Sequence, residues 1–267
     1  MFIDTHCHLD APEFGATQAE LVQAAADAGV GCIVQLSVER ANFETVRILC
    51  NNNPACAPAY GIHPMYTGRA SPDDLAVLRG YLTNHRPVAV GEIGMDFFID
   101  GLDQRTQEFF FVEQLKLARE FDLPVLLHIR RAQDTILKFL RIHKVRGGIA
   151  HAFNGSRQQA GEFIKLGFKL GFGGAMTYSR ALRLRELAAT LPLDAIVLET
   201  DAPDIPPDFL QRGTPNKPEY LPRIARTLAE LRGMTPEQVA QATTENVLSV
   251  LPEIRKHLNF PEIHLPG

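Results

Sequence analysis

The chain has 267 residues, a length that α/β barrels reach as one domain. Hydrophobic residues make up 45% of the sequence and charged residues 22%, a composition typical of a folded globular protein and not of a disordered chain. The formal net charge of −4 excludes a general attraction to polyanions, so a nucleic acid would have to be held by a local site.

The cysteine pattern and the N-terminus indicate a cellular location. The four cysteines form no CxxC pair, which in a chain of this size indicates reduced thiols. Asp4 and His6 interrupt the apolar start at once, so it does not predict a signal peptide. No run reaches the roughly 18 apolar residues that span a bilayer. We therefore expect a cytoplasmic protein with no membrane segment.

Eight short apolar runs recur along the chain and predict buried parallel strands, because most of them are bounded by Gly or Pro. They cover residues 2–8, 31–38, 56–64, 87–94, 123–131, 147–153, 168–176 and 195–203. The segments between them have helical spacing. In 105–122, Phe109, Val112, Leu115 and Leu117 are predicted to share an apolar face.

Two further helices carry recognisable start signals. The segment from Ser71 has a capping pattern with Asp74 and a proline at its first helical position. The segment 156–167 begins on a serine N-cap and ends on Gly167.

Strand and helix thus alternate eight times, the pattern of a (β/α)8 TIM barrel. A doubly wound open sheet is the alternative, but its GxGxxG fingerprint is missing after the first strand. We predict a single barrel domain over residues 1–267, with a peripheral, polar tail from about Pro252.

The first predicted strand ends in His6 and His8, within the segment DTHCHLD. Alternate residues of a strand face the same side and lie about 6.6 Å apart, so both imidazoles can turn toward one point. Two neutral imidazole nitrogens aimed at one point form half of a metal site. A histidine pair in a polar loop, or one buried histidine with a surface neighbour, is the alternative for these two residues.

Other potential metal ligands follow later strands, at the end of a barrel where catalytic groups lie. They are His63, Glu92, His128, His151 and Asp201. Each alone has a structural explanation, such as a hydrogen-bonded core histidine, an ion pair or a turn cap. Together they lie at the same end of neighbouring strands, where buried polar groups need partners, and two divalent cations would serve that need.

We predict two ion sites that share one carboxylate. The ligands of the first ion are His6, His8 and Asp201. The ligands of the second are His128 and His151. Glu92, halfway round the barrel, is the predicted bridge, and Asp201 is placed to accept a proton from the attacking water. The nitrogen-rich ligands favour Zn²⁺ or Mn²⁺ over Mg²⁺, although metal availability can override that preference.

The motifs DTHCHLD, GIHP, GEIGMD, LLHIRRA, HAFNG and LETDAP, in this order over residues 4–203, resemble those of the TatD-like metal-dependent hydrolases of the amidohydrolase superfamily. The resemblance implies a (β/α)8 barrel with a divalent-metal centre, and several members of the family are deoxyribonucleases. It also implies a ligand set, by motif: His6, His8, bridging Glu92, His128, His151 and Asp201. Ile129 after His128, and the FNG after Ala152, depart from the family pattern and bear on substrate preference.

Several other residues keep two interpretations. His63 is predicted to contact the substrate as a third catalytic residue beside Asp201 and Glu92, the alternative being a turn histidine held by the following proline. Arg130 and Arg131 could form a fork for phosphate, or one of them a surface salt bridge.

Three more features are open in the same way. Asp4 and Glu199 could each orient a ligand imidazole or pair with a buried cation. The glycines of GFGG, residues 171–174, could admit substrate or serve barrel packing.

The predicted function is a divalent-metal-dependent hydrolase, a TatD-type deoxyribonuclease acting on single-stranded or frayed DNA. The sequence lacks a basic stripe with interleaved aromatics, but its loops carry a few cations: Arg130, Arg131, Arg157, Arg180, Arg212 and Lys217. One alternative is a metal-dependent amidohydrolase, esterase or phosphatase for a small molecule. Another is a non-enzymatic binding protein, which the complete set of six ligand positions disfavours.

Overall fold

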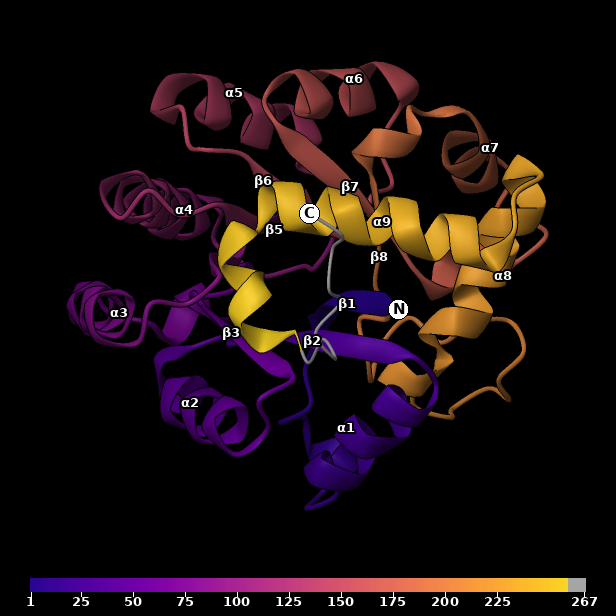
Figure 1. The fold of residues 1–267 in the computed structure, drawn as a ribbon. Helices are drawn as coiled ribbons and strands as arrows, with labels where there is room; N and C mark the ends of the chain where they lie inside the picture. The colour runs from indigo at the N-terminus through magenta and orange to yellow at the C-terminus, as the bar shows by residue number, and fades with distance from the viewer. Residues whose placement is uncertain (259–267) are drawn as a thin grey trace, which may run out of the picture.

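The structure, a computed structural model, describes residues 1–258. Eight parallel strands form its centre and follow one another in chain order around the sheet (Figure 1). They are β1 (Phe2–Cys7), β2 (Val30–Leu36), β3 (Cys56–Tyr60), β4 (Ala89–Asp96), β5 (Val125–Arg130), β6 (Gly148–Ala150), β7 (Phe168–Phe172) and β8 (Ile196–Leu198).

The first strand meets the segment after the last one, which nearly closes the barrel. Cys7 forms a parallel bridge with Ala202, and the Asp201 amide donates to the His6 carbonyl at 2.9 Å. The His8 amide donates to the Ala202 carbonyl at 2.8 Å. The predicted (β/α)8 barrel is therefore confirmed, and the open sheet is excluded because its edge strands would not meet.

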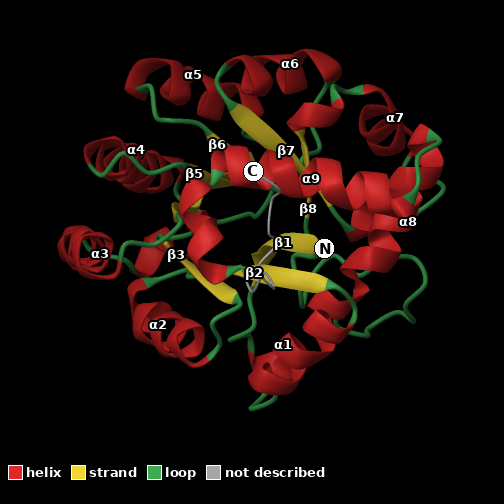
Figure 2. Cartoon of the chain, in the orientation of Figure 1, coloured by secondary structure: helices red, strands yellow, loops and turns green. Residues whose placement is uncertain are grey.

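Eight helices form a ring outside the strands (Figure 2). They are α1 (Gln18–Asp27), α2 (Phe43–Asn52), α3 (Pro72–His85), α4 (Gln104–Glu120), α5 (Gln133–His143), α6 (Arg157–Lys165), α7 (Leu182–Thr190) and α8 (Leu221–Arg232). The predicted caps are confirmed: Ser71 and Asp74 form a capping box on α3, and the Ser156 hydroxyl accepts from the Gln159 amide on α6. Gly167 follows the end of α6 with φ of 84°, a conformation that favours glycine.

The buried face of α4 differs from the predicted one. Phe109 is 43% exposed, whereas Phe110 and Phe111 are buried. Two buried glutamines share the inner face of the helix. The Gln107 side chain bonds both the amide and the carbonyl of Asp96, at 2.8 and 3.0 Å, and Gln114 does the same to Ile62, at 2.6 and 3.0 Å. These side chains satisfy backbone groups where β4 ends and just beyond β3, where Ile62 precedes the predicted site residue His63.

The amino-terminal end of the barrel is covered by a further helix, α9 (Pro236–Val250), which crosses the strands in Figure 1. A 3₁₀ segment, η7 (Pro252–His257), follows it. Ile254 is fully buried and Leu258 is 9% exposed, both in one apolar cluster with Ile3 and Val34 of the first two strands. The prediction of a peripheral tail from about Pro252 is thus wrong for residues 252–258, because these apolar side chains pack under the barrel. Residues 259–267 of that predicted tail lie outside the described part.

A second and larger apolar cluster fills the layer between the strands and the outer helices. Phe2 of β1 and Ile33 of β2 belong to this outer cluster, whereas their neighbours Ile3 and Cys32 belong to the inner one, as the alternation of side chains along a strand requires. The barrel is consequently a packed core whose carboxyl-terminal end is left for polar groups. Within residues 1–258, no helix is both long and apolar enough to cross a membrane.

Candidate metal centre

The carboxylate of Glu92, on β4, lies at the centre of a cluster of five imidazoles. Glu92 is 2% exposed, and its two oxygens face different sides. The Oε2 atom lies 3.0 Å from His6 Nε2 and 3.4 Å from His8 Nε2. These two histidines come from the end of β1 and the residue after it. The strand alternation predicted for the pair therefore does bring both rings toward one point.

The Oε1 atom of Glu92 faces three other imidazoles. It lies 3.1 Å from His128 Nδ1, 3.3 Å from His151 Nε2 and 3.3 Å from His63 Nε2. His128 is on β5, His151 follows β6, and His63 lies three residues after β3. One carboxylate thus separates the imidazoles into the two groups that the sequence predicted, with His63 added to the second.

Asp201 completes the first group. Its Oδ1 atom lies 3.6 Å from His6 Nε2 and 3.9 Å from His8 Nε2, and its side chain keeps 14% of its surface exposed. The φ of Asp201 is 58°, in the left-handed region that aspartate tolerates better than most residues. All six predicted ligand residues therefore converge at the carboxyl-terminal end of the barrel.

The two carboxylates have pKa values shifted in opposite directions. Burial alone would raise the pKa of Glu92, but the imidazoles of His63, His6 and His151 hold it well below its usual range. Burial raises the pKa of Asp201 to about 7, against the opposing effect of the nearby His151 and His8. The central carboxylate is thus stabilised as an anion, whereas burial favours the protonated form of the outer one.

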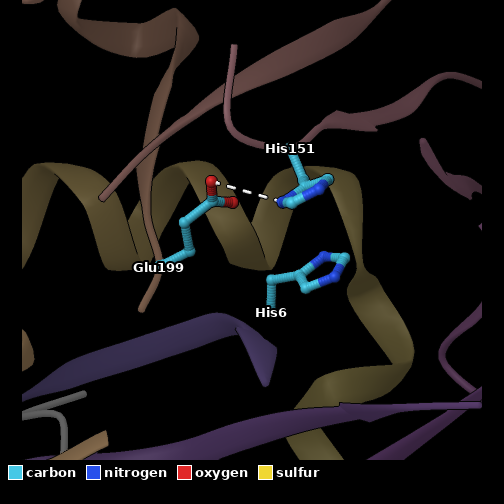
Figure 3. A group of neighbouring side chains, drawn as sticks. All are labelled: His6, His151 and Glu199. Carbon is cyan, nitrogen blue, oxygen red and sulfur yellow. Dashed lines mark ion pairs between the residues drawn. The ribbon is translucent and has the colours of Figure 1, made fainter. Parts of the chain in front are cut away.

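Glu199, which directly follows β8, contacts His151 at Nδ1, the ring nitrogen that does not face Glu92. Its Oε1 atom lies 3.6 Å from His151 Nδ1, an ion pair marked by the dashed line in Figure 3. The same oxygen accepts a hydrogen bond from the Ala152 amide at 2.5 Å. The His151 ring stacks on the His6 ring with centroids 3.8 Å apart. Of the two interpretations of Glu199, the position fits a carboxylate that orients an imidazole.

Two of the GFGG glycines, Gly171 and Gly173, pack against Glu199, whereas Gly174 packs against the backbone of residues 205–207. A Cβ atom on Gly171 would lie 2.1 Å from Oε2 of Glu199, which is too close for any side chain. Packing against Glu199 therefore accounts for Gly171, as the barrel-packing interpretation predicts.

Asp4 has a different role from the two that the sequence suggested. Its carboxylate accepts hydrogen bonds from the Thr200 amide at 2.9 Å and the Thr200 hydroxyl at 2.5 Å, and from the His6 amide at 3.3 Å. It contacts no imidazole through these bonds. Instead it joins the end of β1 to the segment after β8, and so fixes the backbone that carries His6 and Asp201.

Asp96 is a site residue that the sequence reasoning missed. Its Oδ2 atom lies 3.0 Å from His128 Nε2, the ring nitrogen that points away from Glu92. Its Oδ1 atom accepts from the amides of Phe98 and Ile99, at 2.8 and 3.1 Å. The available signal was the spacing in GEIGMD, because a carboxylate four residues after Glu92 on a strand lies on the same face.

His63 begins the 3₁₀ segment η3 (Pro64–Arg69), where its Nδ1 atom accepts a hydrogen bond from the Met65 amide at 3.2 Å. Burial lowers the pKa of His63 to about 4, so the ring is neutral at pH 7. A neutral imidazole whose Nδ1 accepts a proton must carry its own hydrogen on Nε2. The ring is therefore held by the turn that follows it, with Nε2 facing Glu92, and the contact with a substrate stays a prediction.

The donor set fits divalent cations. Among the described residues, three groups of side chains each bring three ligand atoms within 4.8 Å of one another. The groups are His6, His8 and Glu92; His63, Glu92 and His128; and His6, His151 and Glu199. Within residues 1–258, four buried side-chain polar atoms have no hydrogen-bond partner, and three of them belong to this site: His6 Nδ1, His151 Nδ1 and Glu199 Oε2. Imidazole nitrogens and carboxylate oxygens gathered at this density are the ligands that Zn²⁺ and Mn²⁺ accept.

A nearly closed barrel that gathers five imidazoles around one carboxylate at its carboxyl-terminal end defines the class of metal-dependent hydrolases. Residues 3–252 match the family model of the TatD related DNases. The chain therefore belongs to the TatD family of metal-dependent hydrolases, as the motifs predicted.

Two members of this family are particularly similar to the chain. The uncharacterized metal-dependent hydrolase YjjV of Escherichia coli K12 is 44% identical over 253 residues, which cover 93% of this chain and 97% of YjjV. The crystal structure of YjjV, described as a TatD homologue, matches with a TM-score of 0.89 at 41% identity, over 97% of this chain and 98% of that one. A 3'-5' ssDNA/RNA exonuclease TatD of Erwinia billingiae is 30% identical over 250 residues, 91% of this chain and 96% of the relative.

Proposed function

We propose that the protein is a nuclease that hydrolyses phosphodiester bonds in single-stranded or frayed DNA, with two divalent cations as cofactors. The observation that carries the proposal is the division of the imidazoles between the two oxygens of Glu92. A carboxylate shared in this way suits two ions about 3.5–4 Å apart, the spacing used to hold the attacking and leaving oxygens of a phosphoryl transfer. The relative named as a single-strand exonuclease supports the choice of substrate.

In this proposal, the first cation is held by His6, His8 and Asp201, and the second by His128 and His151. Glu92 would contact both. When bound, the cations would supply positive charge for the phosphoryl oxygens and would acidify the attacking water. Zn²⁺ and Mn²⁺ suit the nitrogen-rich set better than Mg²⁺.

Asp201 is the proposed proton acceptor. Its side chain is 14% exposed, against 3% for that of Glu92, so it is the more accessible of the two central carboxylates. It also lies at the end of the barrel where substrate would enter. A water beside His6 and His8 would therefore have a carboxylate within reach to take its proton.

His63 is proposed as a hydrogen-bond donor to the substrate. The Met65 amide occupies its Nδ1, so the Nε2 N–H is the group that faces the site. An N–H donor beside a reacting phosphate stabilises charge that develops on a phosphoryl or leaving oxygen. A metal ligand would instead need a free lone pair on Nε2, which this tautomer does not have.

The proposal extends to the setting of the enzyme. The four buried, unpaired cysteines suit a reducing compartment, and we propose a cytoplasmic protein that works as a single barrel domain.

A Glu92→Gln variant tests the function and the ligand set together. The purified wild-type chain should contain two divalent cations by elemental analysis and should degrade a labelled single-stranded oligonucleotide faster than a blunt duplex. EDTA should abolish this activity and Mn²⁺ or Zn²⁺ should restore it. The variant should lose at least one ion and fall in turnover by about 100-fold or more, because an amide cannot bridge two cations as a carboxylate does.

The matched control is Glu186→Gln, an exposed glutamate on α7 outside the cluster. It should keep both ions and full turnover. Turnover of amides, lactones or small phosphomonoesters without cleavage of any oligonucleotide would replace the nuclease with another metal-dependent hydrolase. Full turnover of Glu92→Gln would refute the bridging role.

A further inference from the structure

A cavity of about 480 Å³ is lined by several residues that follow site residues in the sequence, and by none of the five histidines. Five of its lining residues follow three side chains of the site by two to five positions in the sequence. Phe98 follows Asp96, Arg130 and Arg131 follow His128, and Asn154 and Ser156 follow His151. The volume lies within the range of about 300–1,000 Å³ that small-molecule sites occupy.

Three arginines on this wall have no acidic partner. Arg130, Arg131 and Arg183 line the cavity, and within residues 1–258 none of them forms an ion pair. Six other arginines of that range do form such pairs: Arg40, Arg47, Arg69, Arg79, Arg141 and Arg146. Three cations around one small volume repel each other, and an anion bound among them relieves that repulsion.

Two of these arginines are positioned by an aromatic ring. The guanidinium carbon of Arg130 lies 3.7 Å from the Phe98 ring centroid, and that of Arg131 lies 4.6 Å from it. Phe98 is itself fixed by the hydrogen bond from its amide to Asp96, the residue that contacts His128. The third arginine, Arg183, is held by a neutral group, donating to the Asn154 side chain at 2.7 Å. The cations are therefore ordered without being neutralised.

The amino end of α6 adds a weaker preference of the same sign. The helix starts at Arg157, and its cap Ser156 is part of the cavity wall. Helix N-termini favour anions through their free amides and dipole.

We propose that this cavity binds a second, non-reacting phosphate of the substrate, the phosphate of the nucleotide next to the bond that is cleaved. The inference rests on the proposed nuclease function. It narrows the substrate class to chains with at least two phosphates, because the cavity starts within a few residues of the proposed ligands. Arg130, Arg131 and Arg183 are then binding residues for the substrate chain, and Phe98 is a positioning residue for two of them.

The first test compares two substrates in the metal-loaded enzyme. Bis(p-nitrophenyl) phosphate carries one phosphate, whereas a short single-stranded oligonucleotide carries several. In Arg130→Gln, Arg131→Gln and Arg183→Gln, kcat/KM should fall about tenfold more for the oligonucleotide than for the small diester, mainly through KM, since a charge-assisted hydrogen bond of this kind contributes about that factor. Equal losses on the two substrates, or no loss, would overturn the inference.

Arg226→Gln is the matched control. Arg226 is an exposed arginine of α8 that does not line the cavity and forms no ion pair within residues 1–258. It should leave the ratio of the two kcat/KM values unchanged. Thermal unfolding of each variant separates a binding defect from a folding defect.

The second test adds one phosphate at a time. A thymidine dinucleotide should be hydrolysed with a KM about tenfold lower when a terminal phosphate is attached at one of its two ends. The triple arginine variant should lose this gain. The end that gives the gain also defines the direction in which the chain lies across the site. No gain at either end would contradict the proposal.

A binding measurement separates this inference from the proposed function. The full metal-loaded chain is titrated with a fluorescent single-stranded phosphorothioate oligonucleotide at several salt concentrations. Each arginine removed should reduce the slope of log K against log[salt] by about 0.7, the value for one phosphate contact on a single strand. Salt-sensitive binding that the variants weaken, without hydrolysis of any oligonucleotide, would uphold the cavity and refute the nuclease. Hydrolysis with an unchanged salt slope in the variants would do the reverse.

Discussion

The Nε2 atom of His128 lies 3.0 Å from the Oδ2 atom of Asp96, while its other ring nitrogen lies 3.1 Å from Glu92. Asp96 is placed to accept a hydrogen bond from an N–H on Nε2, and in that tautomer the Nδ1 lone pair faces the cluster. Carboxylates that hold a ligand histidine in this way fix both its tautomer and its orientation.

Asp96→Asn should weaken the second cation site. The asparagine oxygen can still accept from the amides of Phe98 and Ile99, which turns its NH₂ group toward His128 and moves the ring proton to Nδ1. We expect the affinity for the second cation to fall by about 10- to 100-fold. Titration of the metal-free protein with Mn²⁺ measures it. Asp100→Asn, an exposed change in the same loop, is the control, and equal affinities in both variants would contradict the role of Asp96.

His63→Gln should separate catalysis from metal binding. If the Nε2 N–H of His63 only donates to substrate, the variant keeps both cations and loses about 100-fold in kcat. Elemental analysis and turnover on the same preparation give the two numbers. A variant that loses one cation in proportion to its activity would make His63 a ligand of the second group, next to His128 and Glu92.

Ile254→Ala should destabilise the barrel from its far end. Ile254 is fully buried beneath the strands, so the truncation removes apolar contacts and leaves a cavity. We expect the free energy of unfolding to fall by about 2–4 kcal/mol. Ile142→Ala, at a side chain that is 58% exposed, should change it by less than about 0.5 kcal/mol in urea unfolding.

Asp74 should make the free energy of unfolding depend on pH in the acidic range. Burial alone would raise the pKa of Asp74, but hydrogen bonds from the Ser71 amide and from Arg40 lower it below its ordinary value of 3.8. A carboxylate with a lowered pKa in the folded state contributes stability above its ordinary pKa, and that contribution is lost as the pH falls through the folded-state pKa. Asp74→Asn should therefore cost about 1 kcal/mol at pH 7, and much less once the pH has fallen below the lowered folded-state pKa.

Urea unfolding in EDTA at several pH values measures this dependence with metal loading held constant. The exposed neighbour Asp73, changed to Asn, is the control and should follow the wild type more closely throughout. A loss of stability in Asp74→Asn that stays constant down to pH 3 would contradict the charge-based explanation.

The sequence was sufficient for the eight strands and for the convergence of the six ligand candidates. Apolar runs bounded by glycine and proline are a strong signal for buried strands, and a histidine or carboxylate at the end of such a run needs a partner. Asp96 was harder to predict, because the same carboxylate also caps the turn that follows it, through the amides of Phe98 and Ile99. Its second role depends on the distance to a residue on another strand.

Two errors have a common origin in tertiary contacts. Phe109 was placed on the inner face of its helix, but that face is occupied by Gln107 and Gln114, whose polarity hid their burial. The tail is predicted to be peripheral because it is polar and punctuated by prolines. Ile254 is buried because it covers the amino-terminal end of the barrel, which would otherwise be open.

The helix α9 and the segment after it seal one end of the barrel, and the interior is filled with side chains. No polymer can pass through a barrel filled in this way. A nucleic-acid strand would therefore have to approach the carboxyl-terminal end with a free terminus or an unpaired segment. Each released fragment would leave by the opening through which the strand arrived, before the remainder could advance. Product and new substrate would therefore exchange through the same opening, and this exchange, not movement along a tunnel, would limit the rate of successive cleavages.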